Sequence, residues 1–230
     1  MKRHIPNLIT CLNLLSGAFA IVCALTEVGD RWYAVYLIIL AAVFDFFDGL
    51  VARMLGVGSP IGKDLDSLAD VISFGLAPAV LIFQALQQGG ASFFAASPAL
   101  LIAPGAALRL AKFNNDSRQT TSFIGLPVPA NALFWIGVYA SLSSLSLLVE
   151  KTSLLLFIYT LVGLLIYLML SEIPMFSFKI KSWRIRALQA QIVLLLVSLC
   201  ALIFLGLGGF AVAILAYVLL SILQASGSKS

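Results

Sequence analysis

The chain has 230 residues, of which 61% are apolar and only 10% are charged, and its formal net charge is +4. Soluble domains carry roughly 25% charged residues, so this composition excludes an ordinary soluble protein and is typical of an integral membrane protein. No polar stretch is long enough to form a separate soluble domain, so we expect a single transmembrane domain over residues 1–230.

Apolar stretches of about 20 residues predict membrane-spanning helices along the whole chain. We therefore expect an all-α fold, a bundle of about eight transmembrane helices. The last two helices, residues 188–225, are joined by closely spaced glycines and could instead form one re-entrant hairpin; we regard them as accessory. The predicted spans, in chain order, are 6–26, 32–55, 63–86, 92–113, 127–148, 152–170, 188–205 and 208–225.

The basic residues are distributed unevenly between the two ends of these spans. An even number of spans puts both termini on the same side, and all of the 14 lysines and arginines except Arg31 and Lys151 fall on that side. An excess of positive charge marks the cytoplasmic side, so we expect both termini in the cytoplasm and the protein in the cytoplasmic (inner) membrane. The partners of these cations are then anionic membrane lipids and not a nucleic acid.

Acidic residues gather in one apolar stretch. Five of the chain's 10 acidic residues lie between Asp45 and Asp70, where only two cations accompany them. Asp45 and Asp48 are three residues apart, and Asp66 and Asp70 are four apart, so each pair shares one helix face. An unpaired carboxylate near hydrocarbon costs about 2.5–3.5 kcal/mol. Bound divalent cations balance this charge most simply, which predicts a metal site.

The predicted topology brings the two pairs together. Helix 32–55 runs inward and helix 63–86 starts at the same face, so the four carboxylates converge in a polar cavity open to the cytoplasm. Oxygen ligands favour hard ions such as Mg²⁺ or Mn²⁺. Asp64 lies about 200° around the helix from Asp66 and should face away from the cluster, which makes it an internal control.

The spacing of this stretch carries a resemblance to a known family. The catalytic motif over residues 45–70 resembles the signature of the CDP-alcohol phosphotransferase family, D-x2-D-G-x2-A-R-x8-G-x3-D-x3-D, at every fixed position. Residues 5–10 resemble the P-N-x-x-T entry to the family's first helix. Further segments resemble the phosphatidylserine synthase branch of that family, namely residues 67–78, 107–114, 125–129 and 173–179.

The resemblance implies an enzyme that transfers the phosphatidyl group of CDP-diacylglycerol to the hydroxyl of L-serine, giving phosphatidylserine and CMP. It implies two divalent cations, Mg²⁺ or Mn²⁺, and a homodimer. It assigns metal ligation to Asp45, Asp48, Asp66 and Asp70, with Asp70 also acting as the general base on the acceptor hydroxyl. General-base catalysis is typically worth about 10²–10⁴-fold in rate.

Carried over residue by residue, the resemblance also implies the substrate contacts. The residues assigned to CDP-diacylglycerol are Asn7, Thr10, Gly49, Ala52, Arg53 and Gly62. The small residues could instead serve helix packing, and the arginine could reach lipid phosphates.

For the serine itself we consider three residues, Ser73, Arg109 and Asn114. A planar guanidinium can hold a carboxylate in bidentate fashion, which favours Arg109 for the serine carboxylate. The alternatives are an arginine that only follows the positive-inside pattern and, for Asn114, a helix C-cap.

Two other functions compete with serine transfer. The same chemistry could use another acceptor, such as glycerol 3-phosphate, inositol phosphate or an amino alcohol. Intramembrane carboxylates also occur in cation transporters. Against a transporter, the acidic residues gather at one face of the membrane, and the sequence shows no inverted repeat.

Overall fold

The computed structural model of the chain describes residues 4–26, 32–57, 59–116, 123–175 and 185–227. Within these residues the fold is almost entirely helical, with one short antiparallel pair of strands. In chain order the elements are α1 (Ile5–Leu25), α2 (Trp32–Leu55), α3 (Pro60–Asp70), the π-helix η2 (Val71–Leu76), α4 (Ala77–Gln88), α5 (Phe93–Ala96), the 3₁₀-helix η3 (Ser97–Leu101), α6 (Ile102–Asn115), β1 (Phe123–Ile124), α7 (Val128–Leu148), α8 (Lys151–Leu170), β2 (Pro174–Met175), α9 (Ile185–Leu205), the 3₁₀-helix η5 (Gly206–Gly208) and α10 (Gly209–Gly227).

The all-helical membrane fold is confirmed, but the predicted number of spans is not. Among the described residues, six helical segments are long and apolar enough to cross a membrane, and a further apolar helix, Val128–Leu142, is shorter. One of the six is the stretch Ala190–Ala225, which contains most of α9 and most of α10. The structure thus supports about six to seven crossing helices, and the eight spans stay a prediction.

The third predicted helix begins earlier and is less regular than the sequence indicated. We expected it over 63–86, but helical structure runs from Pro60 to Gln88. The earlier start follows from a cap, because the Ser59 side chain accepts a hydrogen bond from the Gly62 backbone N–H and Pro60 occupies the first turn. Directly after Asp70 the helix widens into the π-helix η2, a form that occurs frequently at functional sites.

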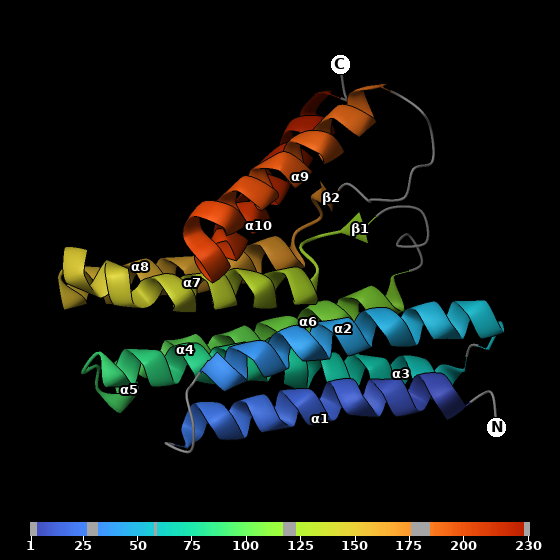
Figure 1. Cartoon of the computed structure of the whole chain (residues 1–230), viewed down its shortest axis with the longest axis horizontal. Helices are drawn as coiled ribbons and strands as arrows, with labels where there is room; N and C mark the ends of the chain where they lie inside the picture. The colour runs from blue at the N-terminus through green and yellow to red at the C-terminus, as the bar shows by residue number, and fades with distance from the viewer. Residues whose placement is uncertain (1–3, 27–31, 58, 117–122, 176–184, 228–230) are drawn as a thin grey trace.

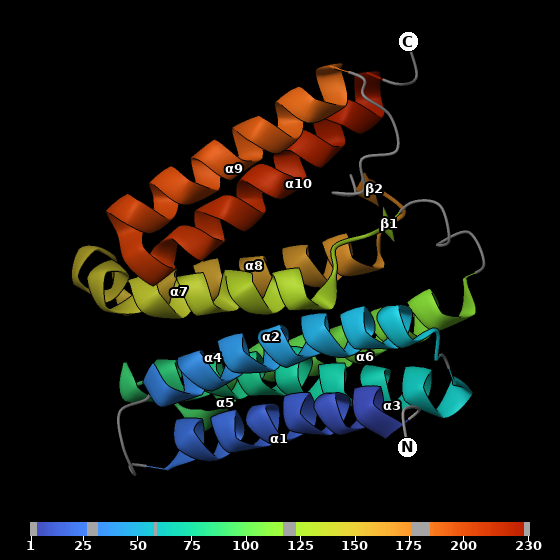
Figure 2. The ribbon, with the colours of Figure 1, turned by 45° about the vertical axis from the view of Figure 1, so that its right-hand side comes forward.

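The helices pack in layers, as Figures 1 and 2 show. Helix α1 lies against α2, α3 and η2, and these form the part of the molecule that contains the acidic motif. Helices α7 and α8 lie on the other side of α4 and α6. Beyond them α9 and α10 form a hairpin that crosses α7 obliquely. Gly206 closes this hairpin with a φ of 56°, a conformation that glycine adopts readily.

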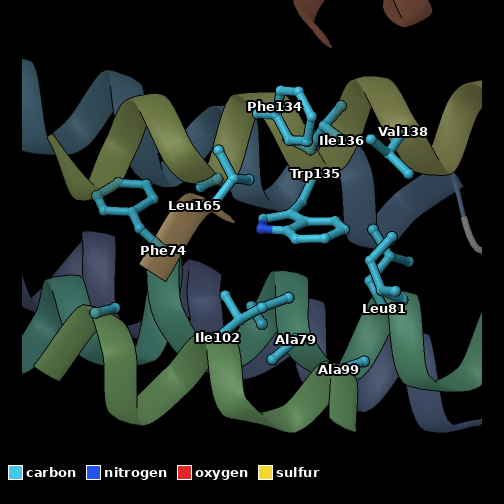
Figure 3. Packing of buried hydrophobic residues seen from close by; sticks show 14 of the residues in the cluster. Phe74, Ala79, Leu81, Ala99, Ile102, Phe134, Trp135, Ile136, Val138 and Leu165 are labelled. Carbon is cyan, nitrogen blue, oxygen red and sulfur yellow. The ribbon is translucent and has the colours of Figure 1, made fainter. Parts of the chain in front are cut away.

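The hydrophobic core lies between α7 and the layer formed by η2, α4 and α6 (Figure 3). Trp135 of α7 is fully buried there and points toward Ile102 and Leu81. Its indole N–H donates to Asn131 Oδ1 at 3.1 Å, so the ring's polar atom is paired inside the core. Phe74 of η2 also enters this core, which ties the turn after Asp70 to a rigid interior.

Two of the segments that resemble the phosphatidylserine synthase branch meet in space. Phe123 pairs with Met175 and Ile124 pairs with Pro174 in the ladder β1–β2. The Gly125 backbone N–H then donates to the Ile173 carbonyl at 2.9 Å. The ladder therefore joins the residues before α7 to the residues after α8. The rest of the second segment, from residue 176 onward, lies outside the described residues.

Candidate active site

Three of the four motif aspartates meet between the end of α2 and the start of α3. One carboxylate oxygen from each of Asp45, Asp48 and Asp66 lies within 4.8 Å of the other two. Asp45 and Asp48 come from successive turns of α2, as their spacing predicts. Asp70 lies outside this group of three, one turn deeper along α3, where it interacts with Asp45 and is only 7% exposed.

Helix α1 supplies a second layer of contacts to these acids. Thr10 Oγ1 donates a hydrogen bond to Asp48 Oδ2 at 2.7 Å, and both residues are buried. Asn13, one turn further along α1, donates from Nδ2 to Asp70 Oδ1 at 3.4 Å. Burial removes the water molecules that would otherwise bond to these two carboxylates, so each of these hydrogen bonds holds a carboxylate in place. Helix α1 therefore orients Asp48 and Asp70.

Asp64 lies where the helical geometry predicts. It is exposed to the surroundings, whereas Asp66 is half-buried and Asp70 is buried. The acidic cluster is therefore specific to one face of α3, and it is not a general accumulation of acids at the helix end.

A cavity of about 280 Å³ opens beside the aspartates at the meeting point of α1, α2 and α3. Its walls contain two of the clustered acids, Asp48 and Asp66. They also contain five of the six residues that we predicted to contact CDP-diacylglycerol, namely Asn7, Thr10, Gly49, Ala52 and Gly62. The structure thus brings these residues from three helices to a single hollow next to the carboxylates.

Gly49 faces open space in this cavity. Among the described residues, a Cβ placed on it would meet no atom within 4 Å outside its own helix, so no neighbouring helix of this part of the chain packs against it. Arg53, the sixth predicted residue, is exposed, and its Nε donates to the Gly49 carbonyl at 2.9 Å. The arginine thus folds back along α2 at the edge of the cavity.

The three residues considered for serine lie in different surroundings. Ser73 is fully buried and its Oγ donates to the Asn13 carbonyl at 3.0 Å, so this hydroxyl joins η2 to α1. Asn114 Nδ2 donates to Ser67 Oγ at 2.7 Å, and its carbonyl accepts from Lys63 Nζ at 3.1 Å. Both side chains are engaged in joining elements, so their contact with serine stays a prediction.

Arg109 is placed differently. It is only 6% exposed, and its guanidinium lies 4.7 Å from the centre of the Phe113 ring. It interacts electrostatically with Asp70 and with Tyr217 of α10. Its Nε and Nη2 are buried and have no hydrogen-bond partner within the described part of the chain. A buried cation with unused donors, within electrostatic reach of the deepest aspartate, is suited to receive an anionic group.

The sequence reasoning missed two residues of this site, Asn13 and Gly17. Asn13 follows Thr10 by three residues, so it lies on the same face of α1, and a polar side chain within an apolar helix is itself a signal of function. Gly17 gave no such signal. A Cβ on it would lie 2.6 Å from the Ser73 Cα, so only glycine allows α1 and η2 to approach this closely.

The donor set fits a divalent cation. The clustered ligand atoms are all carboxylate oxygens, which Mg²⁺ and Mn²⁺ prefer over softer ligands. The residues that could hold such ions are Asp45, Asp48 and Asp66, with Asp70 adjacent. Thr10 holds Asp48 in place, as the outer partners of metal ligands commonly do.

Comparison with known proteins identifies the family. The family model for CDP-alcohol phosphatidyltransferase matches residues 3–176, which contain the acidic cluster, the cavity and the ladder. The chain belongs to the CDP-alcohol phosphatidyltransferase family. The family resemblance of the motif at 45–70 is thus confirmed, and the match extends over most of the chain.

Curated relatives from this family carry consistent names. The chain is 38% identical over 133 residues to a CDP-diacylglycerol–serine O-phosphatidyltransferase of Methanocaldococcus jannaschii, covering 58% of this chain and 59% of that protein. It is 33% identical over 183 residues to a protein of the same name in Helicobacter pylori, covering 79% and 75%. It is 34% identical over 158 residues to an archaetidylserine synthase of Methanothermobacter thermautotrophicus, covering 66% of each. The matches with the first and third of these relatives thus span less than two thirds of the relatives' own lengths.

Proposed function

We propose that the protein transfers the phosphatidyl group of CDP-diacylglycerol to L-serine, forming phosphatidylserine and releasing CMP. The observation that carries this proposal is the cluster of Asp45, Asp48 and Asp66 beside a cavity lined by the predicted CDP-diacylglycerol residues. Family membership and the names of the relatives support the same activity.

The residues support a direct displacement at phosphorus. Serine Oγ forms a bond to the lipid phosphorus as the bond from that phosphorus to the bridging oxygen breaks, and CMP leaves with that oxygen. The proton of the serine hydroxyl passes to the carboxylate of Asp70, the proposed general base. Asp45, Asp48 and Asp66 would hold divalent cations, which would supply positive charge to neutralise the pyrophosphate. Asn13 and the buried surroundings hold Asp70 in one orientation.

The cavity supplies the binding site for the nucleotide. Gly49 and Ala52 leave room for a flat base and its ribose against α2, and Asn7 and Thr10 offer polar atoms from α1. Arg53 at the cavity edge is placed to meet the CDP phosphates or a lipid phosphate. The unused donors of Arg109, which interacts with Asp70, are proposed to bind the serine carboxylate.

The setting of the site belongs to the same proposal. The distribution of basic residues supports a site that opens to the cytoplasm in the inner membrane, with both termini on that side. We propose that residues 1–230 form one catalytic transmembrane domain, that the helices over 188–225 are accessory, and that the protein is a homodimer, as the family resemblance implies.

The test is CMP release by the purified full chain in detergent with CDP-diacylglycerol and Mg²⁺ or Mn²⁺. L-Serine is compared with glycerol 3-phosphate, inositol phosphate and ethanolamine. The proposal predicts metal-dependent release with serine alone. Release with one of the other acceptors would contradict the assignment of serine as the acceptor but would keep the family chemistry. No metal-dependent release with any acceptor would contradict the proposal that the protein is a transferase.

A further inference from the structure

Two buried polar side chains that interact with Asp70 have atoms without a hydrogen-bond partner among the described residues. Asn13 is fully buried, and its Nδ2 donates to Asp70 while its Oδ1 is unpaired within this part of the chain. Arg109, which interacts with the same aspartate, has Nε and Nη2 unpaired. Native proteins leave few buried polar atoms without a hydrogen bond, so an unpaired one indicates a partner from outside the chain.

The unpaired atoms are of opposite kinds. Asn13 offers an acceptor, and Arg109 offers charged donors. Between them lies Asp70, a carboxylate that can take a proton. A hydroxyamino acid presents the matching set of groups, with an ammonium that donates, a carboxylate that accepts and a hydroxyl that reacts. An acceptor that lacks the ammonium would leave the Asn13 oxygen unpaired, at a cost in binding.

The orientation of Asn13 is fixed by its neighbours. Its backbone carbonyl accepts a hydrogen bond from Ser73 Oγ at 3.0 Å, which holds this turn of α1 against η2. Its amide nitrogen faces Asp70 and donates to Oδ1 of that carboxyl group. The Oδ1 is therefore directed away from that carboxylate and is left for another donor.

We propose that Asn13 determines acceptor specificity by accepting a hydrogen bond from the ammonium group of the acceptor through Oδ1. This inference rests on the proposed function and deepens it, because it names the residue that distinguishes an amino acid from other hydroxyl compounds. Asn13 thereby has two contacts with different roles. Its Nδ2 orients Asp70, and its Oδ1 binds the ammonium group of the acceptor.

The test compares L-serine with 3-hydroxypropionate, which keeps the hydroxyl and carboxylate but lacks the ammonium. The measured quantity is the ratio of kcat/KM for the two acceptors, followed by CMP release. Asn13→Ala is expected to lower this ratio by about 10- to 100-fold, the range for a hydrogen bond to a charged group. Loss of the contact to Asp70 slows both acceptors alike and cancels in the ratio.

Asn13→Asp separates the two contacts, because it keeps an oxygen acceptor but loses the donor to Asp70. It is expected to slow the reaction with both acceptors while serine stays preferred. Asn115→Ala is the matched control, since the side chain of Asn115 is exposed and its Nδ2 donates to the Ala111 carbonyl within α6. Gel filtration and thermal unfolding in detergent establish that each variant is folded.

Two results would overturn the inference. An unchanged ratio in folded Asn13→Ala would mean that Asn13 only positions Asp70. If that variant does not fold, a collapse of the ratio in Asn13→Asp, which retains the oxygen, would contradict the proposal instead. Failure of the proposed function looks different, because the unsubstituted protein would then release no CMP with serine.

Discussion

The contact between Gly17 of α1 and Ser73 of η2 offers a sharp test of how the site is held. A Cβ on Gly17 would lie 2.3 Å from Ser73 Oγ and 2.6 Å from Ser73 Cα. Carbon atoms in ordinary contact are about 3.5–4.0 Å apart, so Gly17→Ala forces the two backbones to separate by about 1 Å. The side chain of Ser73 can rotate away, but its Cα cannot.

This separation acts directly on the catalytic residues. Ser73 Oγ would lose its bond to the Asn13 carbonyl, and the long contact from Asn13 to Asp70 would open further. A misplacement of about 1 Å can cost about 10²-fold in rate. We therefore expect Gly17→Ala to lower kcat for serine-dependent CMP release by about 10- to 100-fold. The crowding destabilises the fold by about 1–3 kcal/mol, partly offset by the helix preference of alanine.

Gly163→Ala in α8 is the matched control. A Cβ on Gly163 meets no atom within 4 Å outside its own helix, so this variant should keep full activity and be at least as stable as the unsubstituted protein. CMP release and thermal unfolding are measured for both variants in the same detergent. If Gly17→Ala is folded and as active as Gly163→Ala, the close approach of α1 to η2 does not position Asp70, and the reasoning is refuted.

Three further predictions concern the acidic cluster. Asp48→Asn should abolish CMP release while Asp64→Asn, on the exposed face of the next helix, leaves it within about 2-fold; equal effects would contradict the assignment of faces. Thr10→Val should weaken metal activation by about 10- to 100-fold, because the hydrogen bond to Asp48 is lost. The effect is measured as a shift in the Mg²⁺ titration of CMP release, and Thr160→Val at an exposed position is the control. Mg²⁺ or Mn²⁺ at about 100 times its dissociation constant should stabilise the unsubstituted protein by about 2.7 kcal/mol in thermal unfolding, and the same shift in Asp48→Asn would show that the ion binds elsewhere.

The sequence predicted the acidic cluster because helical spacing alone decides which residues share a face. That geometry, with two helices that share one end, is sufficient to bring together Asp45, Asp48 and Asp66. The same argument excludes Asp64 from the cluster. The cavity residues on α1, Asn7 and Thr10, came from the family resemblance and not from periodicity.

Other features depend on tertiary contacts that no local pattern encodes. The π-helix after Asp70 and the approach of Gly17 to Ser73 arise from how α1 packs on η2. Asn13 is a polar residue within an apolar helix, and only the tertiary contact with Asp70 indicates its role. The hairpin α9–α10 is a further tertiary feature, because its two helices belong to one continuous apolar stretch.

The most direct test of the central claim follows the acceptor into the product. Purified full-length protein in detergent is incubated with CDP-diacylglycerol, a divalent cation and isotopically labelled L-serine, and label in the extracted lipid is measured before and after chelation of the metal. The account predicts label in phosphatidylserine in equal amount to the CMP released, lost on chelation and restored by Mg²⁺ or Mn²⁺. CMP release without label in the lipid, or labelling that survives chelation, would contradict it.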